Sequence, residues 1–169
     1  MFGQFKYYYY FCTVKLNKQL TDNKKDMTKI KENKTMNEAV SIHHNKDGEI
    51  DGVKIQTLDE CFIIALHDLD EGKNDFSHDS AMKRLEELNL KTFSKKQATI
   101  LCAYLDEVNE KLKEAGGEPL AKNIYVTSSS ADYYGDYSWF FHGSHGCLHY
   151  THRINGNFRC RPIHSVIEN

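Results

Sequence analysis

The fold class is decided by residues 124–163, IYVTSSSADYYGDYSWFFHGSHGCLHYTHRINGNFRCRPI. Runs of aromatic and β-branched residues, which are typical of strands, alternate here with turn-forming glycines at 135, 143, 146 and 156. These runs predict four short strands, at Ile124–Ser128, Tyr137–His142, Cys147–Thr151 and Phe158–Ile163. The C-terminal half is therefore expected to be rich in loops and strands.

Two helices are predicted upstream of these strands. Residues 80–90 carry apolar side chains at helical spacing, and a second helix begins at the capping box Ser94-Lys-Lys-Gln97 and ends before Gly116-Gly117. Before the helices, Val53–Ile55 and the apolar run Cys61–His67 predict two strands. This order predicts an α+β fold, with two helices packed on a small, mostly antiparallel sheet and the last strands paired with the first.

The composition indicates one folded domain preceded by a tail. The chain has 169 residues, of which 40% are hydrophobic, enough for one core of ordinary size. Residues 15–37 carry seven Lys and four Asn with no apolar period, so they cannot bury enough surface to offset the entropy of ordering. We predict a disordered Lys/Asn-rich tail at 1–37 and a single domain at 38–169.

Several classes of protein are disfavoured by charge and hydrophobicity. The net charge of -2, from 22 basic and 24 acidic residues, argues against nucleic acid as a partner. No apolar run approaches the roughly 20 residues that span a bilayer, so no membrane insertion is expected. The first residues lack the pattern of a signal peptide. The location stays open, with a cell surface or a phage particle as hypotheses.

The amino-acid usage changes near the end of the chain. Lys, Glu, Gln and Met together number 38, and an even distribution would place about ten of them in residues 123–167, which contain none. The same window holds five of the nine His and the only Trp. Strands are poor in Lys and Glu, which explains part of the deficit but not the abundance of His, Tyr, Asp, Ser, Cys and Gly.

Three segments together resemble a known family. They are the strand at Cys61–Asp68, the helix that ends at Leu105–Leu120, and the closing series Tyr125-Val-Thr-Ser-Ser-Ser, Trp139, Gly146 and Arg161-Pro162. In order and spacing they resemble the C-type-lectin-like domain of the Lcl C-terminal kind, and they are similar to variable proteins of diversity-generating retroelements. The resemblance implies the lectin fold but not lectin activity, because the Glu-Pro-Asn and Trp-Asn-Asp motifs of calcium-dependent lectins are absent.

The resemblance also offers an explanation for the missing residues. Such retroelements randomise adenines in Asn codons, and the resulting codons exclude Lys, Glu, Gln, Met and Trp. Residues 123–167 lack four of these five, and Trp139 stands where the family keeps a fixed core residue. We therefore predict a hypervariable C-terminal surface in a non-enzymatic, ligand-binding protein of receptor or adhesion type.

Strand alternation assigns the binding residues, since successive side chains point to opposite faces. Trp139, Phe141 and Leu148 are expected to face the core. Arg161 is expected to be structural. A surface rich in Tyr and small polar residues binds protein or glycan as antibody paratopes do. The predicted ligand-binding residues are Tyr133, Tyr134, Asp136, Tyr137, Phe140, His142, Ser144, His145, Cys147, His149 and Tyr150.

Two alternatives remain open at this point. His145, Cys147 and His149 alternate along one strand and could hold zinc, which would make the domain structural or metal-binding with an invariant surface. An enzyme of the sulfatase-modifying type shares the lectin-like fold and uses cysteine, yet Cys147 and Cys160 lack a recognisable base arrangement. The leading prediction has no catalytic residues, no metal and no cofactor.

Overall fold

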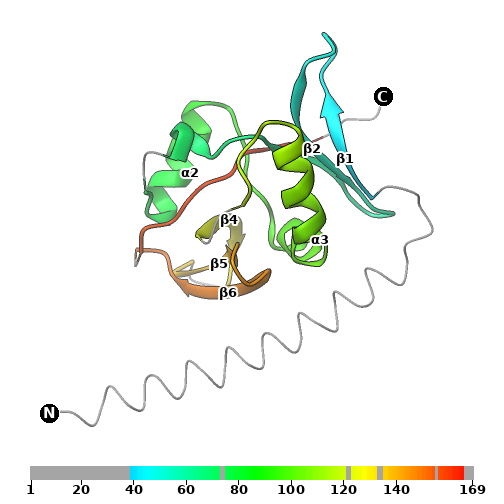
Figure 1. Ribbon diagram of the computed structural model, residues 1–169. Helices are drawn as coiled ribbons and strands as arrows, with labels where there is room; N and C mark the ends of the chain where they lie inside the picture. Colours follow the sequence, from blue (N-terminus) through cyan, green and yellow to red (C-terminus); the bar gives the residue numbers. More distant parts are fainter. Residues whose placement is uncertain (1–38, 73–74, 121–122, 133–134, 155, 166–169) are drawn as a thin grey trace, which may run out of the picture.

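The computed structural model describes residues 39–72, 75–120, 123–132, 135–154 and 156–165. It has α+β architecture, as predicted, with two helices and two antiparallel sheets (Figure 1). The predicted tail at 1–37, and with it Glu38, lies outside the described residues. No helix in the described part of the chain is long and apolar enough to cross a membrane.

The first sheet has the order β1-β2-β3-β7. Its strands are β1 (Val40–His44), β2 (Ile50–Gln56), β3 (Cys61–Ala65) and β7 (Ile163–Ser165). Ile64 of β3 pairs with Ile163 of β7, so the end of the chain joins the sheet that its beginning forms. The prediction that the last strands pair with the first is confirmed for β7 alone, since β4, β5 and β6 pair among themselves.

The second sheet has the order β4-β5-β6 and is made of consecutive hairpins. Its strands are β4 (Ile124–Ser130), β5 (Tyr137–His142) and β6 (Cys147–His152). The β5–β6 register is continuous from Tyr137 opposite His152 to His142 opposite Cys147. The three strands predicted at 124–151 are all present.

Both helices begin at a serine cap. Helix α2 (His78–Glu87) is capped by Ser77, whose side chain accepts a hydrogen bond from the backbone N–H of Ser80. Helix α3 (Lys95–Glu114) has the predicted capping box, in which Ser94 and Gln97 each bond the other's backbone N–H. A short 3-10 turn, η1 (Leu69–Gly72), connects β3 to the region of α2.

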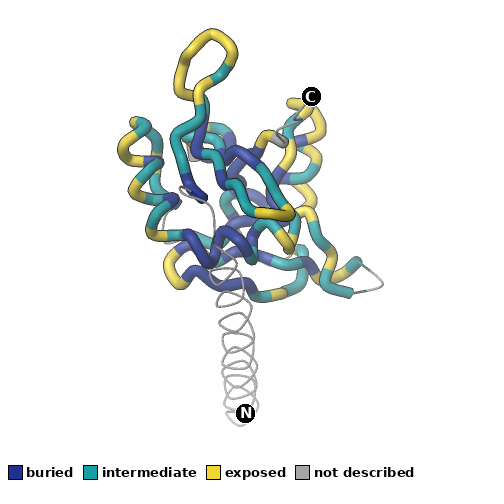
Figure 2. Tube along the Cα trace, turned by 90° about the vertical axis from the view of Figure 1, so that its right-hand side faces the viewer, coloured by how far each residue is buried: buried dark blue, intermediate teal, exposed yellow. Residues whose placement is uncertain are grey.

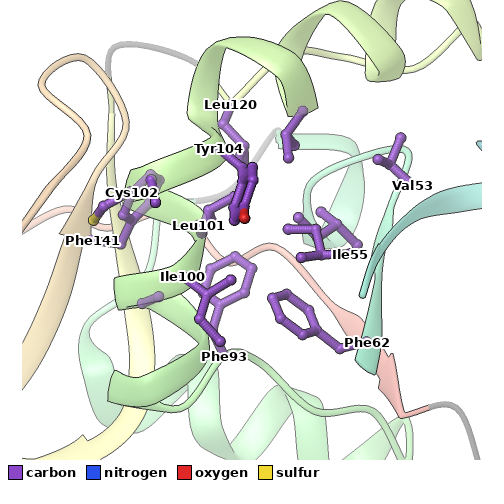
Figure 3. Close-up of a cluster of buried hydrophobic side chains, with 14 of the residues drawn as sticks. Val53, Ile55, Phe62, Phe93, Ile100, Leu101, Cys102, Tyr104, Leu120 and Phe141 are labelled. Atoms are coloured by element: carbon purple, nitrogen blue, oxygen red, sulfur yellow. The ribbon is translucent and has the colours of Figure 1, made fainter. Parts of the chain in front are cut away.

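Helix α3 packs between the two sheets and forms the main core. Val53, Ile55 and Phe62 of the first sheet lie on one side of it, and Phe141 of the second sheet lies on the other (Figure 3). A second cluster, which includes Leu85 of α2, covers the opposite face of β4-β5-β6. Figure 2 shows the buried residues in the middle of the molecule and the exposed ones at loops and helix ends.

Two details of the predicted fold are wrong. The structure has two sheets in place of one, and β1 is an additional strand whose alternating Val, Ser, Ile and His give only a weak apolar pattern. The expected strand Phe158–Ile163 is a crossing segment between the sheets. Phe158 forms an isolated backbone β-bridge with Phe76, and Arg159 forms one with Tyr125 of β4. Because successive residues pair with different neighbours, only Ile163 belongs to a strand.

Candidate ligand-binding site

The β5–β6 hairpin supplies both faces of the predicted binding region. Its α3-facing side carries Trp139, Phe141 and Leu148, and the last two are buried in the main core, as predicted. Gly146, at the turn of the hairpin, lies against Leu105 in the middle of α3, whereas Trp139 lies near Lys95, the first residue of α3. Helix α3 therefore covers one end of the hairpin and leaves the other uncovered.

Four rings on the uncovered end of this face form what we call the aromatic ladder. It consists of Tyr137 and Trp139 on β5 and of Tyr150 and His152 on β6. Ring centroids are 5.4 Å apart for Trp139 and Tyr150, 6.5 Å for the two tyrosines, and 5.3 Å for Tyr137 and His152, all edge to face. Tyr137 is 41% exposed and Tyr150 is 38% exposed, so the ladder offers large apolar area to a ligand.

A cation lies over the inner end of the ladder. The Lys95 Nζ is 3.8 Å from the centroid of the Trp139 ring, which is cation–π geometry. The backbone N–H of Lys95 donates to Ser129 Oγ, so this turn of α3 is held to β4. The neighbouring Lys96 differs, because its ammonium is paired with Glu60 at 2.9 Å.

The opposite face of the hairpin is largely closed. Phe140 is 0% exposed, with its ring 4.1 Å from that of Phe158 and 5.9 Å from that of His78 on α2. Cys147 is also buried. The expectation that Phe140 and Cys147 lie on an outer face is wrong. Helix α2 and Phe158 cover Phe140, whereas Cys147 follows Gly146, which lies against Cys102 and Leu105 of α3.

A histidine cluster lies at the turn end of this closed face. The Nδ1 atoms of His142 and His145 are 3.1 Å apart, and Ser144 Oγ is 3.0 Å from the first and 2.7 Å from the second. His149 stacks on Phe140 and lies 5.6 Å from His142 by ring centroids. Burial, and then the nearby His142, lowers the pKa of His149 to about 4, so its imidazole is neutral at pH 7.

The alternative metal site is not assembled. In the described ranges, no three His, Cys, Asp or Glu side chains are placed to share a metal ion. His145 is exposed in the turn, Cys147 is buried and His149 packs on Phe140, so these three residues do not converge. Burial raises the pKa of the Cys147 thiol, which disfavours the thiolate that binds zinc.

The remaining predicted residues divide by exposure. Tyr133 and Tyr134 lie outside the described residues. His142 and His149 are half-buried, and the exposed ones are Asp136, Tyr137, Ser144, His145 and Tyr150. Sequence reasoning did not include Lys95, Trp139 or His152 among the candidate residues. Trp139 packs against the main core, as predicted, but is only partly buried. Alternation could have identified Trp139, because it places Trp139 on the same face as Tyr137; Lys95 comes near only through the docking of α3.

Comparison with known proteins adds nothing to this geometry. The sequence matches no protein-family model, and no curated protein is significantly similar to it. The function must therefore be inferred from the arrangement of the side chains.

Proposed function

We propose that this is a non-enzymatic, ligand-binding protein of C-type-lectin-like fold that displays a hypervariable C-terminal surface to a protein or glycan. Its closest contact with the ligand is the aromatic ladder, which Asp136 extends, and Ser144 and His145 form a separate exposed patch at the turn end of the hairpin. The ligand-contacting residues of the hairpin belong to the 123–167 window that lacks Lys, Glu, Gln and Met.

The exposed ladder is the single observation that carries this proposal. Tyr137 and Tyr150 are two of the few large apolar side chains that are exposed among the described residues, and they lie on adjacent strands with their rings in contact. Tyr residues give large contact area and a hydrogen-bonding tip at low entropic cost, which is why they dominate binding surfaces.

The lectin-like fold draws support from the order of the elements. Strands come first, two helices follow, a three-stranded sheet carries the candidate surface, and the last strand returns to the first sheet. The resemblance at Trp139 and Arg161-Pro162 supports the same proposal.

Three of the five cysteines are buried in a way that disfavours catalysis by their thiols. Burial raises the pKa of the Cys160 thiol to about 12 and also raises the pKa values of Cys102 and Cys147. Thiols of this kind stay protonated at neutral pH and are poor nucleophiles. Ser144 contacts His145, but no carboxylate among the described residues bonds either His142 or His145 in the way that a catalytic triad requires.

The hypervariable part of the proposal is tested at the level of the gene. We expect a near-copy of the coding segment for residues 131–160 beside a reverse-transcriptase gene, with differences almost only at adenines. A codon that ends in a purine at Ser144, or a locus with neither element, would contradict it.

The binding part is tested by ladder variants. The purified protein and the Tyr137→Ser/Tyr150→Ser double variant are screened on the same glycan arrays and displayed peptide libraries. Loss of two central aromatic contacts is expected to lower the affinity for any ligand by at least about tenfold. The matched control is Leu58→Ser, which removes an apolar side chain that is 70% exposed in the turn between β2 and β3. Equal effects of both changes would contradict a role for the ladder.

A further inference from the structure

The two sheets have four edges, and three of them are closed or interrupted. The edge at β1 carries a register shift between His43 and His44. Strand β7 has only three residues, and the N–H of Ile163 donates to Lys91. At β4, the N–H of Val126 donates to Arg159, and the N–H of Arg159 donates to Ile124. Such devices prevent unwanted strand pairing.

The fourth edge, at β6, is open along part of its length. The N–H of Ala131 donates to the carbonyl of Tyr137, and the N–H of Arg153 donates to the carbonyl of Asp136. Backbone groups alternate between the two sides of a strand. The backbone hydrogen bonds between β5 and β6 therefore join Phe140 to His149 and Ser138 to Thr151. The N–H and C=O groups of Tyr150 and His152 therefore point away from β5. Within the described ranges, no hydrogen bond engages these backbone groups.

Strand β6 also lacks the side chains that protect an edge. Its sequence, Cys-Leu-His-Tyr-Thr-His, contains no Lys, Arg, Asp, Glu or Pro, and its register with β5 is unbroken. The two residues with outward backbone groups, Tyr150 and His152, belong to the aromatic ladder. Beside that ladder lies the Lys95 ammonium, which pairs with no carboxylate among the described residues.

We propose that β6 binds an extended peptide segment of another protein as an added antiparallel or parallel strand, with an acidic side chain of the peptide directed toward Lys95. The inference rests on the proposed function and names the class of partner that the ladder takes. Backbone bonds to Tyr150 and His152 supply affinity, and alternate side chains of the peptide contact the ladder, which gives specificity.

Charge decides between this occupant and a second copy of the chain. Pairing of β6 with β6 of a second copy would bring to the ladder another Lys95 and the side chains of a strand that contains no Asp or Glu. An acidic peptide supplies the missing anion. A glycan can stack on the ladder, but it lacks the regularly spaced N–H and C=O groups that pair with an edge strand.

The probe is a pool of random peptides of about ten residues displayed on mRNA and selected on the full-length protein. We expect the enriched peptides to carry Asp or Glu among alternating β-branched or aromatic residues. The best binder is then resynthesised with one backbone N–H at a time replaced by N-methyl. N-methylation at alternate positions should weaken binding about tenfold, because it removes the bonds to the edge.

A matched pair of variants isolates the backbone of β6. His152→Pro and His152→Ala both remove the imidazole, with its contact to Tyr137 and its acceptance from the Ile154 N–H, but only proline removes the outward N–H. Proline is tolerated where an edge N–H faces outward. We expect His152→Pro to bind the peptide about tenfold more weakly than His152→Ala, with unchanged circular dichroism.

A second pair tests the acidic side chain. Lys95→Gln is expected to weaken binding about threefold and to abolish the preference for the Glu peptide over its Gln form. Lys96→Gln, whose lysine pairs with Glu60, should keep that preference.

Three results would overturn the inference. They are the absence of any enriched peptide, equal binding by His152→Pro and His152→Ala, and a dimer in sedimentation equilibrium that His152→Pro abolishes, which would make a second copy the occupant. The proposed function has a separate failure: a ligand that binds the Tyr137→Ser/Tyr150→Ser variant as tightly as the native protein.

Discussion

At the scale of single residues, His149 shows how burial sets the properties of this surface. Its ring stacks on Phe140 at 6.0 Å between centroids and lies beside His142. The pKa of His142 is lowered as well, mainly by burial and to a smaller extent by the nearby His145. Charged imidazoles are therefore disfavoured on the closed face of the hairpin, and neutral His149 acts as an aromatic packing residue.

This predicts a loss of stability in acid. The pKa of His149 is about 4 in the folded state and near 6.5 when unfolded, so the unfolded state takes up protons first and stability falls as pH decreases from 6.5 toward 4. Between pH 7 and pH 5 the loss from His149 is about 2 kcal/mol. Urea unfolding at the two pH values measures it.

The control for this prediction is His149→Phe, which keeps the stacking on Phe140 and does not titrate. Its free energy of unfolding should depend less on pH over the same range. A pH dependence identical to that of the native protein would show that other groups cause the loss.

At the scale of elements, the position of α3 shapes the ladder. The helix begins at Lys95 above Trp139, and Leu105 reaches Gly146 at the turn of the β5–β6 hairpin. The rings of Tyr137 and Tyr150 lie past the start of the helix and stay uncovered, whereas Phe141 and Leu148 are buried beneath it. The start of α3 therefore determines how much of the hairpin face is available to a ligand.

The cap at Ser94 should contribute measurably to the stability of this arrangement. Ser94→Ala removes the acceptor for the Gln97 N–H and is expected to cost about 1 kcal/mol in the free energy of unfolding. Ser94→Asn, another favourable cap residue, should restore most of that loss. Chemical denaturation of both variants provides the comparison, and equal stability of the two would argue against the cap.

At the scale of the whole molecule, Arg161 joins segments that are distant in the sequence. Its guanidinium is 0% exposed and donates to Asp68 at 2.6 Å, to the carbonyls of Ala65 and Leu66, and to the carbonyl of Glu118. The crossing segment is thereby held to the end of β3 and to the loop after α3. The predicted structural role of Arg161 is confirmed.

Replacement of this arginine should destabilise the fold strongly. Arg161→Met removes the guanidinium from the buried Asp68 carboxylate and from three carbonyls, and we expect a loss of about 3–5 kcal/mol. Arg159→Met, two residues away, breaks a pair with the more exposed Asp75 and should cost less than about 1 kcal/mol. Urea midpoints of the two variants distinguish the cases, and similar midpoints would contradict the role of Arg161.

Local chemistry made much of the fold predictable. The capping box at Ser94, the apolar spacing in both helices and the strands of the second sheet follow from interactions among near neighbours in the chain. The predicted strand at 158–163 failed because the same β-rich residues meet several partners in turn. Partners that are distant in sequence are not encoded in a local pattern.

For the site, the sequence by itself determined that Phe140 and Tyr137 lie on opposite faces of β5, since alternation is a property of the strand. It determined also where the unusual residues lie, within 123–167. Only the tertiary structure decided which face is closed: α2 and Phe158 bury Phe140, whereas α3 begins too late to cover Tyr137 and Tyr150. Burial depends on where separate elements dock, and that is set by packing across the whole chain.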